Sequence, residues 1–264
     1  MVLARIPYKI KQGLKAYTNL YMRRLRPVIV FTTGRVGSMA LHGALEKHGI
    51  FAFHLHTLNP AELKNRKHPQ SWLWAYNHII QPRRPARIIS IVRDPVALMV
   101  SDFFPKLRWI ARQERAYEKL SAERLCDLFT TRYFEQERHL RQLDWFDREM
   151  KQCLGIDVFQ HPFPKEDGYL RFQQALYDVL VFKTELDDTE KTRIVGDFLG
   201  LRQFEIFRSN VGAQKSYGDA YHTFKQLLAV PERRLTEVYS SRYARHFYTK
   251  QEIAEFSARW SGNR

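Results

Sequence analysis

A short stretch of the chain combines residue types that can hold an anion. The segment VIVFTTGRVGSMALH carries two glycines, an arginine and a serine between Gly34 and Ser38. A tight turn between a strand and a helix exposes backbone N–H groups at the positive end of the helix dipole, and Arg35 adds a full charge. Thr33 and Ser38 can donate hydroxyl hydrogen bonds, while Gly34 and Gly37 allow close backbone approach. The pattern predicts a phosphate-binding loop; the alternative is an ordinary junction capped by Ser38.

The loop departs from the pattern of the nucleoside triphosphatases. Their loop reads GxxxxGK followed by Ser or Thr, whereas here Ser38 follows Gly34 by four residues and the loop contains no lysine. Asp94 stands between an arginine and a proline rather than at the end of an apolar strand as a metal ligand. We therefore expect no metal site and no magnesium-dependent hydrolysis.

A second segment, RIISIVRDPVALMVSDFF, joins another strand to another helix. Arg93 ends the strand, Pro95 suits the first helical turn, and Ser101 follows eight residues after the arginine. Arg93 and Ser101 can converge on one phosphate if the strand end folds back beside the helix. The alternative for Arg93 and Asp94 is a salt bridge at the strand end.

Two histidines at the end of the second strand along the chain, expected at 50–56, are candidates for a general base. His54 and His56 alternate with Leu55, so they point to the same face of the sheet. A histidine with a pKa near neutrality suits proton abstraction from a hydroxyl. We prefer His56, which lies nearer the carboxyl end of the strand, with His54 as its neighbour or substitute; a carboxylate that the sequence does not place is the other option.

Weaker candidates for ligand contacts lie elsewhere in the chain. Lys183 follows a strand, and Lys215 lies in the glycine-flanked segment VGAQKSYG. An alternating aromatic patch can stack on sugar or adenine, although core packing is the other role for such residues; it comprises Trp72, Trp74 and Tyr76.

The amino-acid composition indicates in which compartment the protein is expected and which class of partner it favours. The 264 residues carry a formal charge of +15, which favours anionic partners such as nucleotides, acidic glycans, phospholipid head groups or nucleic acid. Cys126 and Cys153 are too few for a disulfide framework, which indicates a reducing, cytoplasmic setting. No apolar run is long enough for a membrane span, and the first residues lack a signal-peptide core.

Strands alternate with helices along the chain. The strands are expected at 28–33, 50–56, 87–92 and 178–183, with helices at 38–49, from Pro95, within 106–153, up to Gly200, and to the C-terminus. This order predicts an α/β fold with a mostly parallel central sheet flanked by helices and a helical C-terminal half. Ligands then bind at the carboxyl ends of the strands.

We expect a basic amphipathic helix over residues 1–26 and a single α/β domain over 27–264. The first 26 residues contain seven Lys or Arg side chains and no acidic one. Such a helix either packs on the domain with a solvated basic face or attaches peripherally to an anionic membrane surface, here the inner face.

The two loop segments together resemble sulfotransferases. TTGRVGS is similar to their 5′-phosphosulfate loop, with arginine where many members have lysine, and R-x-P-x5-S is similar to their 3′-phosphate segment. The resemblance implies a P-loop-like three-layer fold that binds 3′-phosphoadenosine 5′-phosphosulfate (PAPS), releases 3′-phosphoadenosine 5′-phosphate (PAP) and needs no metal. It also implies a donor site of ten residues: Thr33, Gly34, Arg35, Val36, Gly37, Ser38, Met39, Arg93, Ser101 and Lys215. Arg35 would also act in catalysis by stabilising the sulfuryl and leaving-group oxygens.

A narrower similarity covers residues 145–168, 181–188 and 210–226, including WFDREMKQCLGIDVFQHPFPKEDG. These stretches resemble a bacterial family described as "putative capsular polysaccharide synthesis protein", and the resemblance implies a carbohydrate acceptor. We therefore expect a PAPS-dependent sulfotransferase that acts on a carbohydrate hydroxyl. The alternatives are a nucleotide-dependent phosphotransferase and a non-catalytic polyanion-binding protein; no nucleic-acid-binding signature is present.

Overall fold

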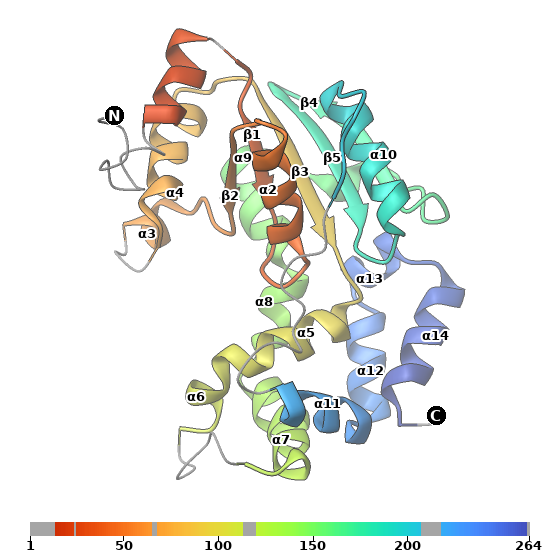
Figure 1. Cartoon of the computed structure of the whole chain (residues 1–264). Coiled ribbons are helices and arrows are strands. Elements are labelled where there is room, and N and C mark those ends of the chain that lie inside the picture. The colour runs from red at the N-terminus through yellow and green to blue at the C-terminus, as the bar shows by residue number, and fades with distance from the viewer. Residues whose placement is uncertain (1–13, 24, 65–67, 113–119, 207–217, 263–264) are drawn as a thin grey trace.

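A five-stranded sheet forms the centre of the protein (Figure 1). The computed structural model describes residues 14–23, 25–64, 68–112, 120–206 and 218–262. The strand order is β2-β1-β3-β5-β4, in which the first four strands are parallel and β4 pairs antiparallel with β5. The strands are β1 (Val28–Phe31), β2 (Ala52–Leu55), β3 (Ala86–Val92), β4 (Tyr169–Gln174) and β5 (Tyr177–Lys183). The predicted α/β class with a mostly parallel sheet is confirmed.

Strand β4 is absent from the elements that the sequence predicts. Its residues, YLRFQQ, alternate between half-buried and exposed positions, whereas β5 is buried at six of its seven positions. An edge strand with one partner and little burial carries a weak hydrophobic signal, because its side chains need not fill a core. The tight connection to β5 passes through Ala175, which adopts a left-handed backbone conformation.

Two hydrophobic cores cover the two faces of the sheet and give the fold three layers. Val30, Ile89 and Leu180 point to one face and pack with helices α2 (Ser38–Lys47) and α10 (Asp188–Leu199). The alternate residues of the same strands point to the other face, where they join a larger cluster contributed by helices from both halves of the chain. Strands buried on both faces explain the near-continuous apolar runs of β1, β3 and β5.

A helical body lies beyond the carboxyl ends of the strands (Figure 1). It begins at β3, which leads directly into α5 (Pro95–Phe103), with Asp94 capping the helix through a hydrogen bond from the Val96 N–H. The body also contains α6 (Leu107–Ile110), α7 (Ala122–Leu128), α8 (Arg138–Leu143), α11 (Gly218–Leu227), α12 (Glu232–Tyr239), α13 (Arg242–Phe247) and α14 (Lys250–Trp260). Three short helices lie outside it: α3 (Pro60–Leu63), α4 (Gln70–Ala75) and α9 (Gln152–Leu154). The helical C-terminal half is thereby confirmed.

The described part of the expected N-terminal helix packs on the domain. Ala16 and Leu20 are buried and belong to the same core cluster as the sheet. Residues 1–13 and Arg24 lie outside the described residues, so the membrane alternative stays a prediction. Within the described ranges, every helix is too short or too polar to cross a bilayer.

Candidate functional site

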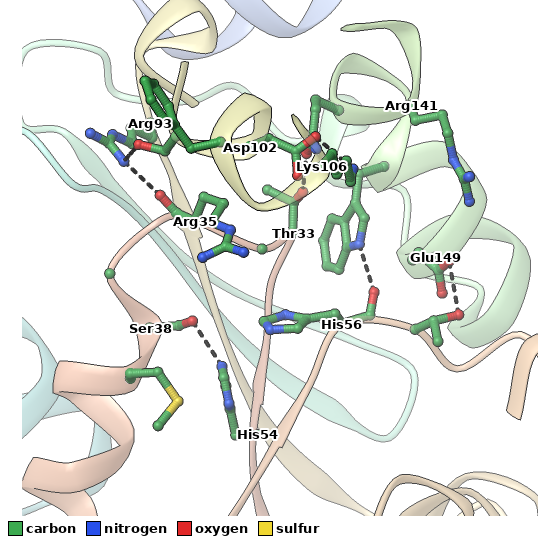
Figure 2. A pocket seen from close by; sticks show the side chains of 18 of the residues that line it. Thr33, Arg35, Ser38, His54, His56, Arg93, Asp102, Lys106, Arg141 and Glu149 are labelled. Atoms are coloured by element: carbon green, nitrogen blue, oxygen red, sulfur yellow. Dashed lines mark hydrogen bonds and ion pairs between the residues drawn. The ribbon is translucent and has the colours of Figure 1, made fainter. Parts of the chain in front are cut away.

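A cavity of about 990 Å³ opens at the carboxyl ends of β1, β2 and β3 (Figure 2). One side, which we call the loop side, is formed by the segment after β1, the end of β3 and α5; its main residues are Arg35, Ser38, Arg93 and Ser101. The opposite side, which we call the helix side, is formed by α3, α4, α8 and the wide helical turn Phe146–Lys151; its main residues are Glu62, Trp72, Arg141, Arg148 and Glu149. His56 lines the cavity between the two sides.

Cationic side chains predominate around the cavity. Six Lys or Arg residues line it against three carboxylates, Glu62, Asp102 and Glu149. Asp102 is already paired, because it accepts hydrogen bonds from Lys106 Nζ at 2.6 Å and from Tyr133 Oη at 3.2 Å. The net charge of the lining therefore favours an anionic ligand.

The segment after β1 has the backbone of an anion-binding loop. Arg35 adopts a φ of 74° and Gly37 a φ of 81°, both in the left-handed region. Such a conformation at a non-glycine residue costs about 1–2 kcal/mol, and strain of this kind is concentrated at functional sites. Gly37 is the residue before α2, and no side chain caps the helix. The Ser38 hydroxyl contacts His54 instead of capping α2, so the expected Ser38 cap is wrong; backbone N–H groups at the start of a helix can bind an anion.

The remaining loop residues divide into those that face the cavity and those that support it. Thr33, Gly34 and Met39 line the cavity, and Thr33 Oγ1 donates to Gln142 Oε1 at 2.5 Å, which ties the loop to α8. Val36 is buried in the core under the loop, and its carbonyl accepts a hydrogen bond from Thr184. A Cβ added at Gly34 or Gly37 would meet no atom within 4 Å, so the space beside the loop backbone is open to a ligand.

Arg93 and Ser101 meet as their spacing suggests. The Arg93 guanidinium donates from Nη1 to Ser101 Oγ at 2.9 Å and to the Arg35 carbonyl at 2.7 Å (Figure 2). The strand end therefore folds back beside α5, and the two arginines lie on the same rim of the sheet. Nη1 carries two N–H groups, and these two contacts do not use the N–H groups of Nε and Nη2, which can bind a ligand.

Asp94 has a separate, structural role beneath Arg93. Its buried carboxylate accepts hydrogen bonds from Tyr239 Oη at 2.9 Å and Trp260 Nε1 at 2.8 Å, which fasten α12 and α14 to the end of β3. The Tyr243 hydroxyl accepts from the Arg93 N–H and donates to the Arg93 carbonyl. The alternative of an Arg93–Asp94 salt bridge is wrong, because their side chains contact different partners.

His54 is held neutral next to the loop. Its Nε2 lies 2.8 Å from Ser38 Oγ, and its ring is 4.7 Å from that of His56. Burial, reinforced by the neighbouring His56 and His42, lowers the pKa of His54 to about 3. His54 therefore positions the Ser38 hydroxyl and is a poor proton acceptor at neutral pH.

His56 has the geometry of a general base. Its Nδ1 lies 2.8 Å from the Thr32 carbonyl, which can only accept, so Nδ1 carries the proton and Nε2 carries the lone pair. Burial lowers the pKa of His56 below its ordinary value, partly offset by the bond to Thr32, while the nearby Arg35 lowers it further. The imidazole is thus neutral at pH 7 and able to accept a proton at Nε2.

The π-helical turn Phe146–Lys151 and Trp145, which directly precedes it, hold the chain just after β2. Trp145 Nε1 donates to the His56 carbonyl at 2.9 Å. Glu149 accepts from the Thr57 hydroxyl at 3.1 Å and from the Leu58 N–H at 2.9 Å. Burial raises the pKa of the Glu149 carboxyl. Sequence reasoning missed both residues; their i, i+4 spacing places them on one helical face, but it does not tell which strand end that face meets.

The remaining candidates from the sequence differ in whether they line the cavity. Trp72 lines the cavity, whereas Trp74 stacks on Phe53 and Tyr76 packs against the core. Lys183 is buried in an ion pair with Glu252, 2.7 Å from Oε1, and does not line the cavity, so its expected ligand contact is wrong. Lys215 lies outside the described residues.

The two cysteines show no sign of reactivity. Burial raises the pKa of the Cys126 thiol to about 11 and that of Cys153 to about 12, so neither is a thiolate at neutral pH. Both are free thiols, as their number and spacing suggest.

Comparison with known proteins identifies one similarity. No curated protein and no solved structure matches the chain. Residues 119–249 match the model of a family described as "Putative capsular polysaccharide synthesis protein". The matched range contributes Arg141, Trp145, Arg148 and Glu149 to the helix side, whereas Arg35 and Arg93 precede it. This part of the chain is therefore similar to the capsular polysaccharide synthesis family.

Proposed function

We propose that the protein is a sulfotransferase that moves the sulfuryl group of PAPS to a hydroxyl of a carbohydrate. The observation that carries the proposal is the pair of contacts from the Arg93 guanidinium to the Arg35 carbonyl and the Ser101 hydroxyl. These contacts bring two anion-binding elements onto one rim, as an adenosine cofactor with separate 5′ and 3′ anionic groups requires. The carbohydrate acceptor is supported by the description of the matching family.

The loop side suits the donor in shape and charge. The open space beside Gly34 and Gly37, the uncapped start of α2 and the Arg35 side chain would receive the 5′-phosphosulfate. Arg93 and Ser101 would hold the 3′-phosphate. Bound there, PAPS supplies an activated sulfuryl group, and no residue has to form a covalent bond to it.

The residues of the chain then have defined tasks in the transfer. His56 Nε2 accepts the proton of the acceptor hydroxyl while its Nδ1–H stays bonded to Thr32. The acceptor oxygen forms a bond to sulfur as the bond between sulfur and the bridging phosphate oxygen breaks, and PAP departs with the electron pair. Arg35 stabilises the charge that develops on the sulfuryl and leaving oxygens but donates no proton, because a guanidinium stays charged.

Calorimetric titration with PAP, ADP and ATP tests the donor assignment. We expect PAP to bind more tightly than ADP, with no requirement for magnesium, because only PAP carries the 3′-phosphate that Arg93 and Ser101 would hold. Arg93→Ala should reduce the PAP-to-ADP affinity ratio about tenfold or more, the value of one charge-assisted contact. The matched control is Arg245→Ala, an exposed arginine on α13 that does not line the cavity.

The same titrations separate the alternative functions. An unchanged PAP-to-ADP ratio in Arg93→Ala would contradict the assignment of Arg93. Tighter binding of ATP than of PAP would favour a phosphotransferase, and equal binding of all three nucleotides would favour a non-catalytic polyanion-binding protein. Transfer of labelled sulfate from PAPS to a glycan then tests the reaction itself.

A further inference from the structure

The helix side contains two arginines whose hydrogen-bonding groups are not satisfied within the described residues. Arg141 Nη2 lies 3.7 Å from Glu62 Oε1, and Arg148 Nη2 lies 3.9 Å from Glu149 Oε1. Both distances are beyond hydrogen-bond range, so these are loose ion pairs. Arg148 Nε is buried and has no hydrogen-bond partner in the part of the chain that the structure describes. A buried donor without an acceptor is unfavourable, so a small movement of the Arg148 side chain that brings this N–H to an oxygen atom of a ligand would be stabilising.

The two arginines form one stripe with a tryptophan. Arg141, Trp145 and Arg148 are spaced i, i+4 and i+7 along a nearly continuous helical segment, and all three line the cavity. Helical rise separates the two arginine Cα atoms by about 10 Å, so the stripe suits an extended ligand better than a single small ion. Trp145 is also the residue that fixes the His56 carbonyl. The stripe therefore borders the place where the base would meet the acceptor.

The neighbouring carboxylates do not occupy these guanidinium groups. Glu149 is committed to the Thr57 hydroxyl and the Leu58 N–H. The Glu62 and Arg141 side chains are 38% and 66% exposed, so Glu62 can turn into solvent at little cost. A planar or tetrahedral oxyanion that accepts two N–H groups from one guanidinium binds more strongly than either loose pair.

The helix side also offers a surface for a sugar ring. His68 stacks on Trp72 with the ring centroids 4.8 Å apart, and both line the cavity. Aromatic rings beside charged and hydroxyl groups match the mixed apolar and polar faces of a sugar.

We propose that the acceptor is an anionic glycan and that Arg141 and Arg148 bind carboxylate or ester sulfate groups on it. The proposal rests on the proposed function, since it names the substrate class of the same cavity. It concerns the helix side alone and predicts binding in the absence of any nucleotide. Its success or failure is therefore measured separately from that of the donor assignment.

The test measures binding of matched oligosaccharides by calorimetry, without nucleotide. The probes are a glucuronate-containing oligosaccharide, the same oligosaccharide with its carboxyl groups reduced to alcohols, and that reduced form carrying ester sulfate. We expect the glucuronate or the sulfated probe to bind at least tenfold more tightly than the reduced probe. The anionic probe that binds more tightly identifies the group that the arginines recognise.

Two double variants test whether Arg141 and Arg148 cause the preference for the anionic probes. The double variant Arg141→Gln/Arg148→Gln should lower the ratio of anionic to reduced affinity to near one while leaving PAP affinity within about twofold. The control Arg233→Gln/Arg245→Gln removes the same charge from exposed sites on α12 and α13 that do not line the cavity. This control variant should retain the wild-type ratio of anionic to reduced affinity, because the ratio depends on the two arginines in the cavity and not on the net charge of the protein.

Three results would overturn the proposal. They are equal affinity for the anionic and reduced probes, a preference that survives in the Arg141→Gln/Arg148→Gln variant, and the absence of binding for every probe. Because PAP titration of the same samples reports folding and the loop side, a failure of glycan binding with intact PAP binding is a failure of this proposal alone.

Discussion

The loop side and the helix side of the cavity are built in different ways. On the loop side, the critical contact joins Arg93 to Ser101, eight residues apart, across one strand-to-helix junction. On the helix side, the contacts join residues about 90 positions apart, such as His56 with Trp145 and Leu58 with Glu149. The Arg93–Ser101 contact is a property of local chain geometry, and the second contact of the loop side, from Arg93 to the Arg35 carbonyl 58 positions away, follows from the pairing of β1 with β3. The contacts of the helix side depend on how the helical body docks on the sheet.

This difference suggests a division of labour between the sides. If the proposed function holds, a change on the loop side should affect binding of the donor, and a change on the helix side should affect the acceptor. The four predictions below test whether the two sides can be disrupted separately, beginning with the largest expected effect.

Loss of His56, the proposed base, should affect turnover alone. His56→Asn removes the proton acceptor, and we expect kcat to fall about 10²- to 10⁴-fold with little change in PAP affinity. The wild-type rate should decrease as the pH falls through the pKa of His56, which lies below its ordinary value of 6.5. Steady-state kinetics between pH 5 and 8, with His48→Asn outside the cavity as a control, provide the measurement. A His56→Asn variant with wild-type kcat would assign the base to another group.

Loss of the anchor beneath the loop side should affect stability. Asp94→Ala leaves the Tyr239 hydroxyl and the Trp260 N–H buried without an acceptor, and we expect the free energy of unfolding to fall by about 2–5 kcal/mol. Urea unfolding measures the change. Tyr239→Phe, which removes a single donor, should cost about 1 kcal/mol. If Asp94→Ala costs no more than Tyr239→Phe, the carboxylate is not the anchor of α12 and α14.

Loss of the hydrogen bonds that Glu149 accepts on the helix side should lower kcat without changing donor affinity. Glu149→Gln retains one acceptor oxygen for two donors, so the chain after β2 loosens and kcat should fall about tenfold while PAP affinity is unchanged. The pH profile should keep its shape, because His56 remains the titrating group. A fall as large as that of His56→Asn, with the acidic limb of the profile lost, would instead make Glu149 the base.

Acidification should destabilise the region around His54. The folded protein holds His54 neutral with a pKa of about 3, whereas the unfolded chain binds a proton near 6.5. Stability from this group is therefore complete above pH 6.5 and is lost as the pH falls, by up to about 1.4 kcal/mol per pH unit. His54→Gln should show a shallower decrease in unfolding free energy between pH 7 and 5. Equal slopes in the two proteins would contradict the assigned pKa.

The parallel sheet and the residues of the loop after β1 can be predicted from the sequence. Apolar strands buried on both faces leave near-continuous hydrophobic runs, and Gly34, Arg35, Gly37 and Ser38 directly follow such a run. The sequence also indicated the paired histidines, because alternation along a strand fixes the face to which their side chains point.

The groups that surround those residues are set by tertiary contacts. The left-handed backbone at Arg35, the hydrogen bond from His56 Nδ1 to the Thr32 carbonyl, which leaves the ring lone pair on Nε2, and the contacts of Trp145 and Glu149 with the chain after β2 all depend on how distant segments pack. Edge strand β4 was not predicted, because a strand that pairs with one neighbour and is only partly buried needs no regular pattern of apolar side chains. The physical reason is the same throughout: local periodicity records which face of an element is buried, but the partner on that face is chosen by how the elements pack.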